Sequence, residues 1–166
     1  MRHLPKGIEI MNERLPVRRA NRLANFDYSS PYAYFVTFCV QGGKCLFWNW
    51  EDGEWNHKLT PLGLIVDEAI RAVDNNDDIV VDQYVVMPNH VHMIVVLPSS
   101  TDAPVHLSNV IRYVKSKVTK AAGHAIWQKS YYDHVIRNQE DYSRIRDYIV
   151  NNPGKWKEDR YYIAHP

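Results

Sequence analysis

The sequence predicts an α+β fold, a ferredoxin-like (RRM-like) split βαβ sandwich with an antiparallel sheet and an added C-terminal helix. The first observation is the order of the hydrophobic patterns, which read strand, helix, strand, strand, helix, strand and then a further helix. The second is the length, because 166 residues suit one compact domain. The third is a composition of 45% hydrophobic and 23% charged residues, which excludes a disordered or collagen-like chain.

The first half of the pattern begins at Tyr32 to Val40, where β-branched and aromatic residues predict a strand. After a glycine turn, Cys45 to Trp48 predicts a short returning strand, and the polar segment from Asn49 to Lys58 predicts a loop. Thr60 is placed to cap a helix that has Pro61 in its first position. Apolar residues then recur at helical spacing at Leu62, Ile65, Val66, Ala69, Ile70 and Val73.

The second half of the pattern supplies the remaining strands and helices. Ile79 to Met87 and Val91 to Leu97 predict two neighbouring strands, and a helix is expected from about Leu107 to Ala122. Its expected buried stripe is Leu107, Val110, Ile111, Val114 and Val118. The last elements are a short strand at Asp133 to Arg137 and a helix capped by Asn138, with Tyr142, Ile145 and Ile149 on its apolar side and Pro153 at its end.

Charge is segregated along the chain although the formal net charge is only +1. Residues 1–23 and 111–146 are basic, and residues 24–110 between them are acidic. Two basic segments favour a polyanionic partner, and a solvated helix face with a basic tail is the alternative interpretation. Because residues 1–31 show no sustained periodicity, we interpret them as an N-terminal basic arm and residues 32–166 as the domain.

The sequence also indicates where the protein acts. Its longest apolar runs are far shorter than the roughly 20 residues that cross a bilayer, so no membrane association is expected. The N-terminus has no apolar core of a secretory signal. Two cysteines cannot form a disulfide framework, which fits a reducing compartment. We therefore expect a cytoplasmic protein.

The pattern Asn89-His90-Val91-His92 contains the most informative pair of residues. Side chains two apart on a strand share a face, so His90 and His92 project together while Val91 points to the other side. Two such imidazoles can hold one divalent cation, although two histidines on a solvent-facing strand would give the same pattern. No further cysteine or paired carboxylate is close in sequence, so protein would hold the ion incompletely, as in a catalytic site.

The C-terminal helix offers a candidate nucleophile. Tyr148 and Asn152 are four residues apart and therefore stack on one side of the helix, whereas Tyr142 falls on the apolar side and is expected in the core. A phenol with a pKa near ~10 is a poor nucleophile at neutral pH unless its electrophile is activated. A cation that polarises a phosphodiester would provide that activation.

Three blocks, FDYSSPYAYFVTFCVQGGKCLF, DQYVVMPNHVHMIVVLP and WQKSYYDHVIRNQEDYSRIRDYIVNNPGKW, extend this interpretation. Together they resemble the REP-associated tyrosine transposases, a bacterial branch of the single-tyrosine HUH transposases and nucleases. The resemblance runs from about Asn25 to Trp156 and rests on MPNHVH and DYIVNNP at this separation. It implies that residues 32–166 form an HUH single-tyrosine transposase domain.

The resemblance also implies a mechanism. Members of the family use the HUH histidines to bind Mg²⁺ or Mn²⁺, and a helical tyrosine attacks single-stranded DNA to leave a 5′-phosphotyrosine and a free 3′-hydroxyl. On this sequence, His90 and His92 become metal ligands, Tyr148 the nucleophile and Asn152 the third ligand. Related HUH transposases often carry glutamine where Asn152 stands.

The expected substrates are short imperfect palindromes, REP-like sequences that fold into single-stranded DNA hairpins. Candidate phosphate contacts are Arg18, Arg19 and Arg22 in the arm and Arg112, Lys115, Lys117 and Lys120 on the basic helix. Candidate aromatic residues for stacking on unpaired bases are Trp127, Tyr131 and Tyr132, at least one of which is expected in the core.

Two other functions remain open at this point. A cleavage-inactive regulator would bind hairpins with the same fold, and the intact set of His90, His92 and Tyr148 argues against it. In a metal-dependent hydrolase, water would attack and Tyr148 would only orient the substrate, leaving no DNA linked to protein. The chain is expected to act as a monomer or a homodimer.

Overall fold

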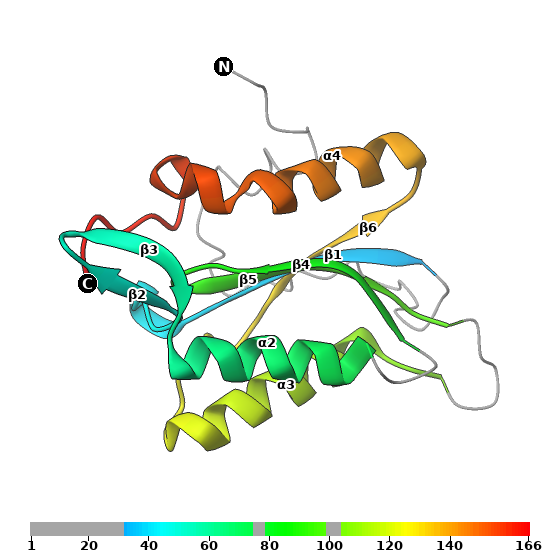
Figure 1. The fold of residues 1–166 in the computed structure, drawn as a ribbon. Helices are drawn as coiled ribbons and strands as arrows, with labels where there is room; N and C mark the ends of the chain where they lie inside the picture. Colours follow the sequence, from blue (N-terminus) through cyan, green and yellow to red (C-terminus); the bar gives the residue numbers. More distant parts are fainter. Residues whose placement is uncertain (1–31, 75–78, 99–103) are drawn as a thin grey trace.

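A four-stranded antiparallel sheet forms the centre of the protein in a computed structural model that describes residues 32–74, 79–98 and 104–166 (Figure 1). Its strands are β1 (Ala33–Cys39), β4 (Val80–Val86), β5 (His90–Val96) and β6 (Tyr132–Ile136). Their order in the sheet is β4-β5-β1-β6, and every neighbouring pair is antiparallel. This arrangement confirms the α+β class, with the strand order of a split βαβ fold.

The helices lie on both faces of this sheet. Figure 1 shows α2 (Pro61–Asp74) and α3 (Leu107–Ala122) below it and α4 (Gln139–Asn151) above it. Because successive side chains of a strand point to opposite faces, β1 contributes Tyr34 to the core under α2 and α3, and Phe35 to the smaller core under α4. Each face of the sheet therefore has a hydrophobic layer of its own.

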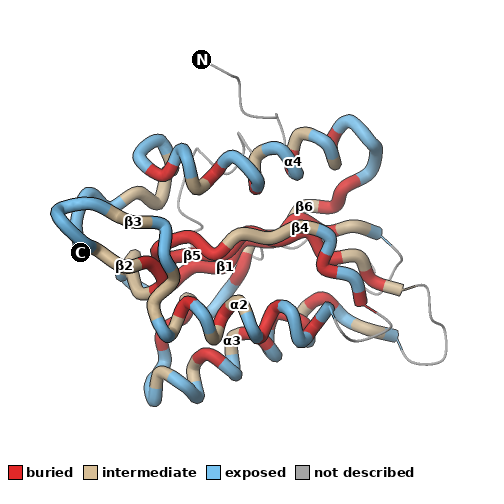
Figure 2. The backbone as a smooth tube through the Cα atoms, viewed as in Figure 1, coloured by how far each residue is buried: buried red, intermediate tan, exposed pale blue. Residues whose placement is uncertain are grey.

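The two central strands are the most buried part of the molecule, as Figure 2 shows in red. Every residue of β1 except Ala33 and every residue of β5 except Val96 is buried. They pair along their whole lengths, with Thr37 opposite His92 and Cys39 opposite His90. The histidine pattern thus lies on one of the two most buried strands of the sheet rather than on a solvent-facing one.

The predicted helix limits are largely confirmed by their capping contacts. Thr60 Oγ1 accepts a hydrogen bond from Gly63 N at 3.0 Å, and Asn138 Oδ1 accepts one from Asp141 N at 2.8 Å. Gly123 ends α3 with φ of 74°, a left-handed conformation that glycine adopts without steric cost. The buried residues of α3 are Leu107, Val110, Ile111, Val114 and Val118, as the spacing predicts.

The prediction of a loop at Asn49 to Lys58 is wrong. A hairpin of β2 (Trp48–Glu51) and β3 (Glu54–Leu59) occupies this segment as a separate two-stranded sheet. Most of its residues are exposed or half-buried, so the strands carry no continuous apolar face that the sequence pattern would reveal. The short strand expected at Cys45 begins only at Trp48, after a 3-10 turn, η2 (Gln41–Gly43).

Two further expectations concern the N-terminal arm and membrane-spanning helices. The basic arm, residues 1–31, lies outside the described residues, and the division into arm and domain stays a prediction. Among the described residues, no helix combines the length and the apolar character required to cross a bilayer.

We expect Gly63→Ala to destabilise the protein by about 1–3 kcal/mol, because overpacking a close contact costs that much. A Cβ at this position of α2 would overlap the Phe47 carbonyl oxygen, which itself accepts the Thr60 N–H. Urea unfolding should show the loss, and Leu64→Ala, at an exposed neighbouring position, is the control. Equal stability of Gly63→Ala and the parent protein would contradict this close packing.

Candidate active site

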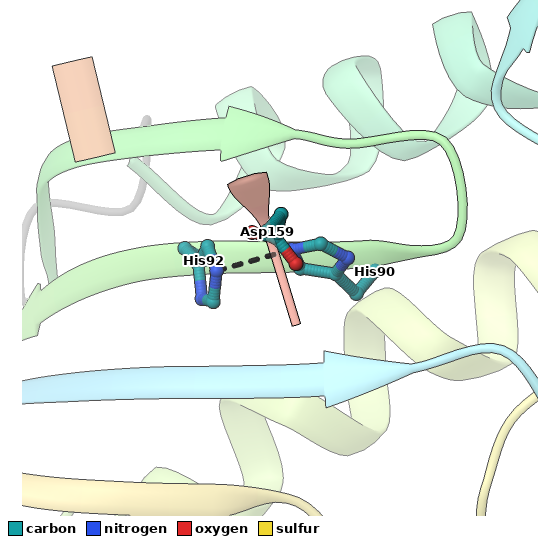
Figure 3. A group of neighbouring side chains, drawn as sticks. All are labelled: His90, His92 and Asp159. Atoms are coloured by element: carbon teal, nitrogen blue, oxygen red, sulfur yellow. Dashed lines mark hydrogen bonds and ion pairs between the residues drawn. The ribbon is translucent and has the colours of Figure 1, made fainter. Parts of the chain in front are cut away.

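Two buried imidazoles form the centre of the candidate site, and Figure 3 shows them on β5 beside Asp159. They lie on the face of β5 that α4 covers, where Tyr148 contacts His92. His90 and His92 are both fully buried, and their Nε2 atoms are 3.0 Å apart. Val91 between them belongs to the core on the opposite face. The structure therefore places the two histidines as the strand alternation predicts.

Hydrogen bonds from neighbouring residues fix the orientation of both rings. Asn89 Nδ2 donates to the carbonyl oxygens of Gly43 and Tyr161, so its Oδ1 is left as the acceptor for His90 Nδ1 at 2.8 Å. His90 Nδ1 then carries the ring proton and Nε2 offers its lone pair. His92 Nδ1 lies 2.6 Å from Thr37 Oγ1 on β1, the residue directly opposite it in the sheet.

Burial keeps both rings neutral at physiological pH. Removal from water lowers the pKa of His90 to about 3, and the same cause lowers the pKa of His92 well below its usual value. Neutral imidazole is the form that ligates metals. The two Nε2 atoms are 3.0 Å apart, a hydrogen-bond distance, and a cation bound between them would take the place of the shared proton.

Asp159 brings a carboxylate to the same place, and sequence reasoning missed it. It follows η3 (Pro153–Glu158), the 3-10 segment after α4, and its Oδ2 lies 3.7 Å from His90 Nε2 with 1% of the side chain exposed. Its backbone N donates to the Trp156 carbonyl oxygen, and its Oδ1 accepts the Tyr161 N–H at 2.7 Å. No motif marks this aspartate, because it reaches the histidines only through the turns after the last helix.

The donor set of His90, His92 and Asp159 fits a divalent cation. One atom from each residue lies within 4.8 Å of the other two. Neighbouring ligands about 2.1 Å from an octahedral ion are themselves about 3.0 Å apart, which agrees with the 3.0 Å between the Nε2 atoms. Two imidazoles and a carboxylate suit a first-row ion such as Mn²⁺ better than they suit Ca²⁺, which prefers an all-oxygen shell.

Tyr148 on α4 faces this cluster. Its hydroxyl is 3.3 Å from His92 Nε2, and its ring packs edge-on against Phe35 at 6.2 Å between ring centres. Burial raises the pKa of Tyr148 well above its usual value, so the phenol keeps its proton at neutral pH. The structure thus brings together the tyrosine and the histidines that the sequence separates by more than 50 residues.

Asn152 lies beside the tyrosine at the end of α4. Asn152 is 3% exposed. Its side-chain amide lowers the pKa of Tyr148, but burial of the tyrosine raises this pKa by more. Among the described residues, Asn152 Nδ2 has no partner at hydrogen-bond distance. Its role as a metal ligand stays a prediction.

Tyr142, expected in the core, is only partly there. Its ring packs against the small core under α4, but its hydroxyl donates to Asp82 Oδ2 at 2.6 Å in an exposed position. This contact ties α4 to the strand β4 and leaves Tyr142 away from the histidines. Tyr148 is therefore the tyrosine of this helix that meets the cluster.

The candidate DNA contacts are distributed differently. Arg18, Arg19 and Arg22 lie outside the described residues. On α3, which lies on the sheet face opposite α4 (Figure 1), Arg112, Lys117 and Lys120 are exposed. Lys115 is half-buried, donates to the carbonyl oxygens of Gln128 and Ser130, and has a pKa lowered to about 8 by burial. Contacts of these residues with DNA stay predictions.

The three candidate stacking residues take part in packing. Trp127 is buried between Phe38 and Phe47 and donates its indole N–H to the Lys115 carbonyl oxygen. Tyr131 is buried in the same core, and half-buried Tyr132 packs edge-on against Phe35. Core packing thus accounts for Trp127, as expected for at least one of the three.

Comparison with known proteins supports the family suggested by the sequence. A REP-associated tyrosine transposase of Escherichia coli is 32% identical over 119 residues, covering 71% of this chain and 70% of its own. An uncharacterized protein of Haemophilus influenzae is 29% identical over 88% of this chain and 93% of its own. The chain belongs to the REP-associated tyrosine transposase family.

Structural comparison agrees with this family. A solved REP-associated tyrosine transposase bound to a REP hairpin matches with a TM-score of 0.62 and 29% identity, over 81% of this chain and 73% of its own. A search against models of protein families found no match. Relatedness to REP-associated tyrosine transposases supports a transposase-like, DNA-binding function for this protein.

We expect this member of the family, in the presence of a chelator, to lose stability as the pH falls below 6.5. The unfolded chain protonates its histidines near pH 6.5, whereas folded His90 has a pKa of about 3, so the unfolded state takes up more protons between these values. Between pH 7.5 and pH 5, this difference amounts to on the order of 2 kcal/mol for His90. Urea unfolding with a chelator present measures it.

A matched pair of variants isolates the contribution of His90. His90→Asn should make the unfolding free energy less dependent on pH, with His92 still contributing, and His165→Gln, at an exposed histidine, should leave the dependence unchanged. An equally steep dependence in His90→Asn would show that other groups cause the acid sensitivity.

Proposed function

We propose that this protein is a metal-dependent single-stranded DNA endonuclease and strand transferase that acts on palindromic hairpins. The observation that supports it most is the position of the Tyr148 hydroxyl, 3.3 Å from His92 Nε2, which in turn lies 3.0 Å from His90 Nε2 in the cluster with Asp159. The candidate nucleophile is therefore in direct contact with a residue of the candidate cation site. The relative solved with a REP hairpin supports the choice of hairpin DNA as substrate.

The residues that would hold Mg²⁺ or Mn²⁺ are His90 and His92, with Asp159 as an anionic ligand and Asn152 as a further candidate. A bound ion would polarise the scissile phosphodiester and offset the negative charge that develops on it. Thr37 and Asn89 orient the two rings through hydrogen bonds to their Nδ1 atoms, which leaves the Nε2 atoms toward the ion.

Tyr148 carries the covalent step in this proposal. Its oxygen attacks phosphorus, a bond from phosphorus to the tyrosine oxygen forms, and the bond to the 3′ oxygen breaks. The phenol loses one proton and the departing 3′ oxygen takes one up, so the products are a 5′-phosphotyrosine and a free 3′-hydroxyl. The reverse reaction with another 3′-hydroxyl rejoins strands.

The environment of Tyr148 suits this reaction. Burial keeps the phenol protonated, and the amide of Asn152 acts in the opposite direction by stabilising the phenolate. The tyrosine therefore gains nucleophilic character chiefly when positive charge is brought beside it. Attack by Tyr148 would therefore require both a cation at the histidines and a bound phosphodiester.

We expect Tyr148→Phe to abolish the covalent product while hairpin binding stays within about twofold, because the ring still packs and only the nucleophile is lost. The assay incubates labelled single-stranded hairpin oligonucleotides from the flanking genomic DNA with protein and Mn²⁺. Denaturing electrophoresis then reveals a shifted, protease-sensitive band. Tyr142→Phe, on the same helix, is the matched control and should keep this band.

Other outcomes of this assay would contradict the proposal in distinct ways. Cleavage without a protein-linked product would identify water as the nucleophile. Binding without cleavage on every hairpin would make the protein a regulator that has kept the fold. An adduct that survives in Tyr148→Phe would place the nucleophile on another residue.

We expect Asp159→Asn to raise the Mn²⁺ concentration for half-maximal adduct formation by about tenfold or more, since losing a ligand or its orienting partner typically costs 10- to 100-fold in affinity. Asp147→Asn, at an exposed position of α4, should leave it unchanged. Asn152→Ala in the same titration tests the other candidate ligand. An unaltered Mn²⁺ dependence in Asp159→Asn would remove Asp159 from the site.

A further inference from the structure

A cavity lies next to the candidate active site, between the β2–β3 hairpin and the segment that follows α4. Figure 1 shows this hairpin beside the end of the chain. The cavity has a volume of about 450 Å³, within the range of pockets that hold small ligands. Its lining residues are Trp50, Trp55 and His57 from the hairpin and Lys155, Trp156 and Tyr162 from the C-terminal segment, among others.

Aromatic rings form both sides of this pocket. Trp50 and Trp55 pack edge-on at 4.9 Å on the hairpin side, and Trp156 and Tyr162 pack edge-on at 5.3 Å on the other. The Trp55 indole N–H donates to the Ile163 carbonyl oxygen, which holds the two sides together. Flat aromatic walls of this kind suit a planar ring such as a nucleobase, because every base has a π-face on which an aromatic side chain can stack.

The hairpin backbone directs a further ring to this pocket. His57 has φ of 61°, a left-handed conformation that is uncommon for a residue other than glycine. Its imidazole stacks on Trp48 at 4.6 Å between ring centres and remains exposed. Such backbone conformations concentrate at functional sites, where neighbouring contacts hold them.

Charged groups around the aromatic walls match the other parts of a nucleotide. Lys155 and Lys157 are exposed, and neither has an ion pair or hydrogen bond with a side chain in the part of the chain that the structure describes. Ammonium groups of this kind contact phosphates. Glu54 and Glu158 also line the pocket, and carboxylates accept hydrogen bonds from amino groups of bases.

Trp156 connects this pocket to the candidate active site. Its indole lines the pocket and also lies 6.2 Å from the His90 ring. The indole nitrogen is buried and has no hydrogen-bond partner among the described residues. One side chain therefore separates a nucleotide in the pocket from the histidines that would meet the scissile phosphate.

We propose that this pocket binds one unpaired nucleotide of the DNA strand that enters the active site, with its base against Trp50 and its phosphate at Lys155 and Lys157. The inference rests on the proposed function and extends it, because it assigns a place to DNA outside the hairpin stem. The pocket would favour DNA strands that have an unpaired base at a fixed distance from the cleaved bond.

The test combines abasic substitutions with variants of Trp50. Hairpin oligonucleotides carry a single abasic site at successive positions of the unpaired flanking strand, and their affinities are measured with Mn²⁺ by fluorescence anisotropy. For the parent protein, we expect one position at which the abasic site lowers affinity by about tenfold, the size of one lost stacking contact. In Trp50→Ala, an abasic site at this position should lower affinity no more than one at the other positions. In Trp50→Phe, the tenfold effect at this position should be retained.

Charge variants provide the matched comparison. Lys155→Gln and Lys157→Gln should weaken binding and reduce its salt dependence, whereas Lys58→Gln, on the same hairpin but outside the pocket lining, should change neither. Identical abasic profiles for the parent, Trp50→Ala and Trp50→Phe proteins would overturn the proposal. The profile reports binding alone, so it succeeds or fails independently of the adduct assay with Tyr148→Phe.

Discussion

Pairing of β1 with β5 is the constraint on which the rest of the structure depends. The two strands align along their full lengths and are buried on both faces, so their side chains must alternate strictly between two separate cores. A shift of one residue would move both histidines into the core under α2 and α3 and would bring Val91 to α4. The same register sets Thr37 opposite His92, where its hydroxyl meets the imidazole.

The polar cluster survives inside an apolar layer because each member has a partner. Asn89 uses its amide to join the His90 ring to the turn at Gly43 and to Tyr161 near the end of the chain. Buried polar groups of this kind cost free energy unless their hydrogen bonds are satisfied. Among the described residues of this cluster, the Asn152 Nδ2 group is the one without a hydrogen-bond partner, and it lies beside Tyr148 near the place where a cation and a phosphodiester are proposed to bind.

Local patterns predicted the parts of the fold that local physics determines. The limits of α3, the caps at Thr60 and Asn138, and the shared face of His90 and His92 follow from short-range periodicity and side-chain chemistry. The β2–β3 hairpin was missed because exposed strands show no apolar alternation. Asp159 was missed because a tertiary turn, rather than spacing along a helix or strand, brings it to His90.

The segment after α4 gives the site a distinctive order of assembly. Thr37, His92, Tyr148 and Asp159 come from four distant parts of the chain, so the site is complete only when contacts of large sequence separation have formed. The aspartate is held by a short 3-10 turn and a few backbone hydrogen bonds, the kind of segment that opens locally without global unfolding. Local opening of this segment would move the Asp159 carboxylate away from the histidines and leave the sheet intact. The fold can therefore persist in states in which the cluster of His90, His92 and Asp159 is incomplete.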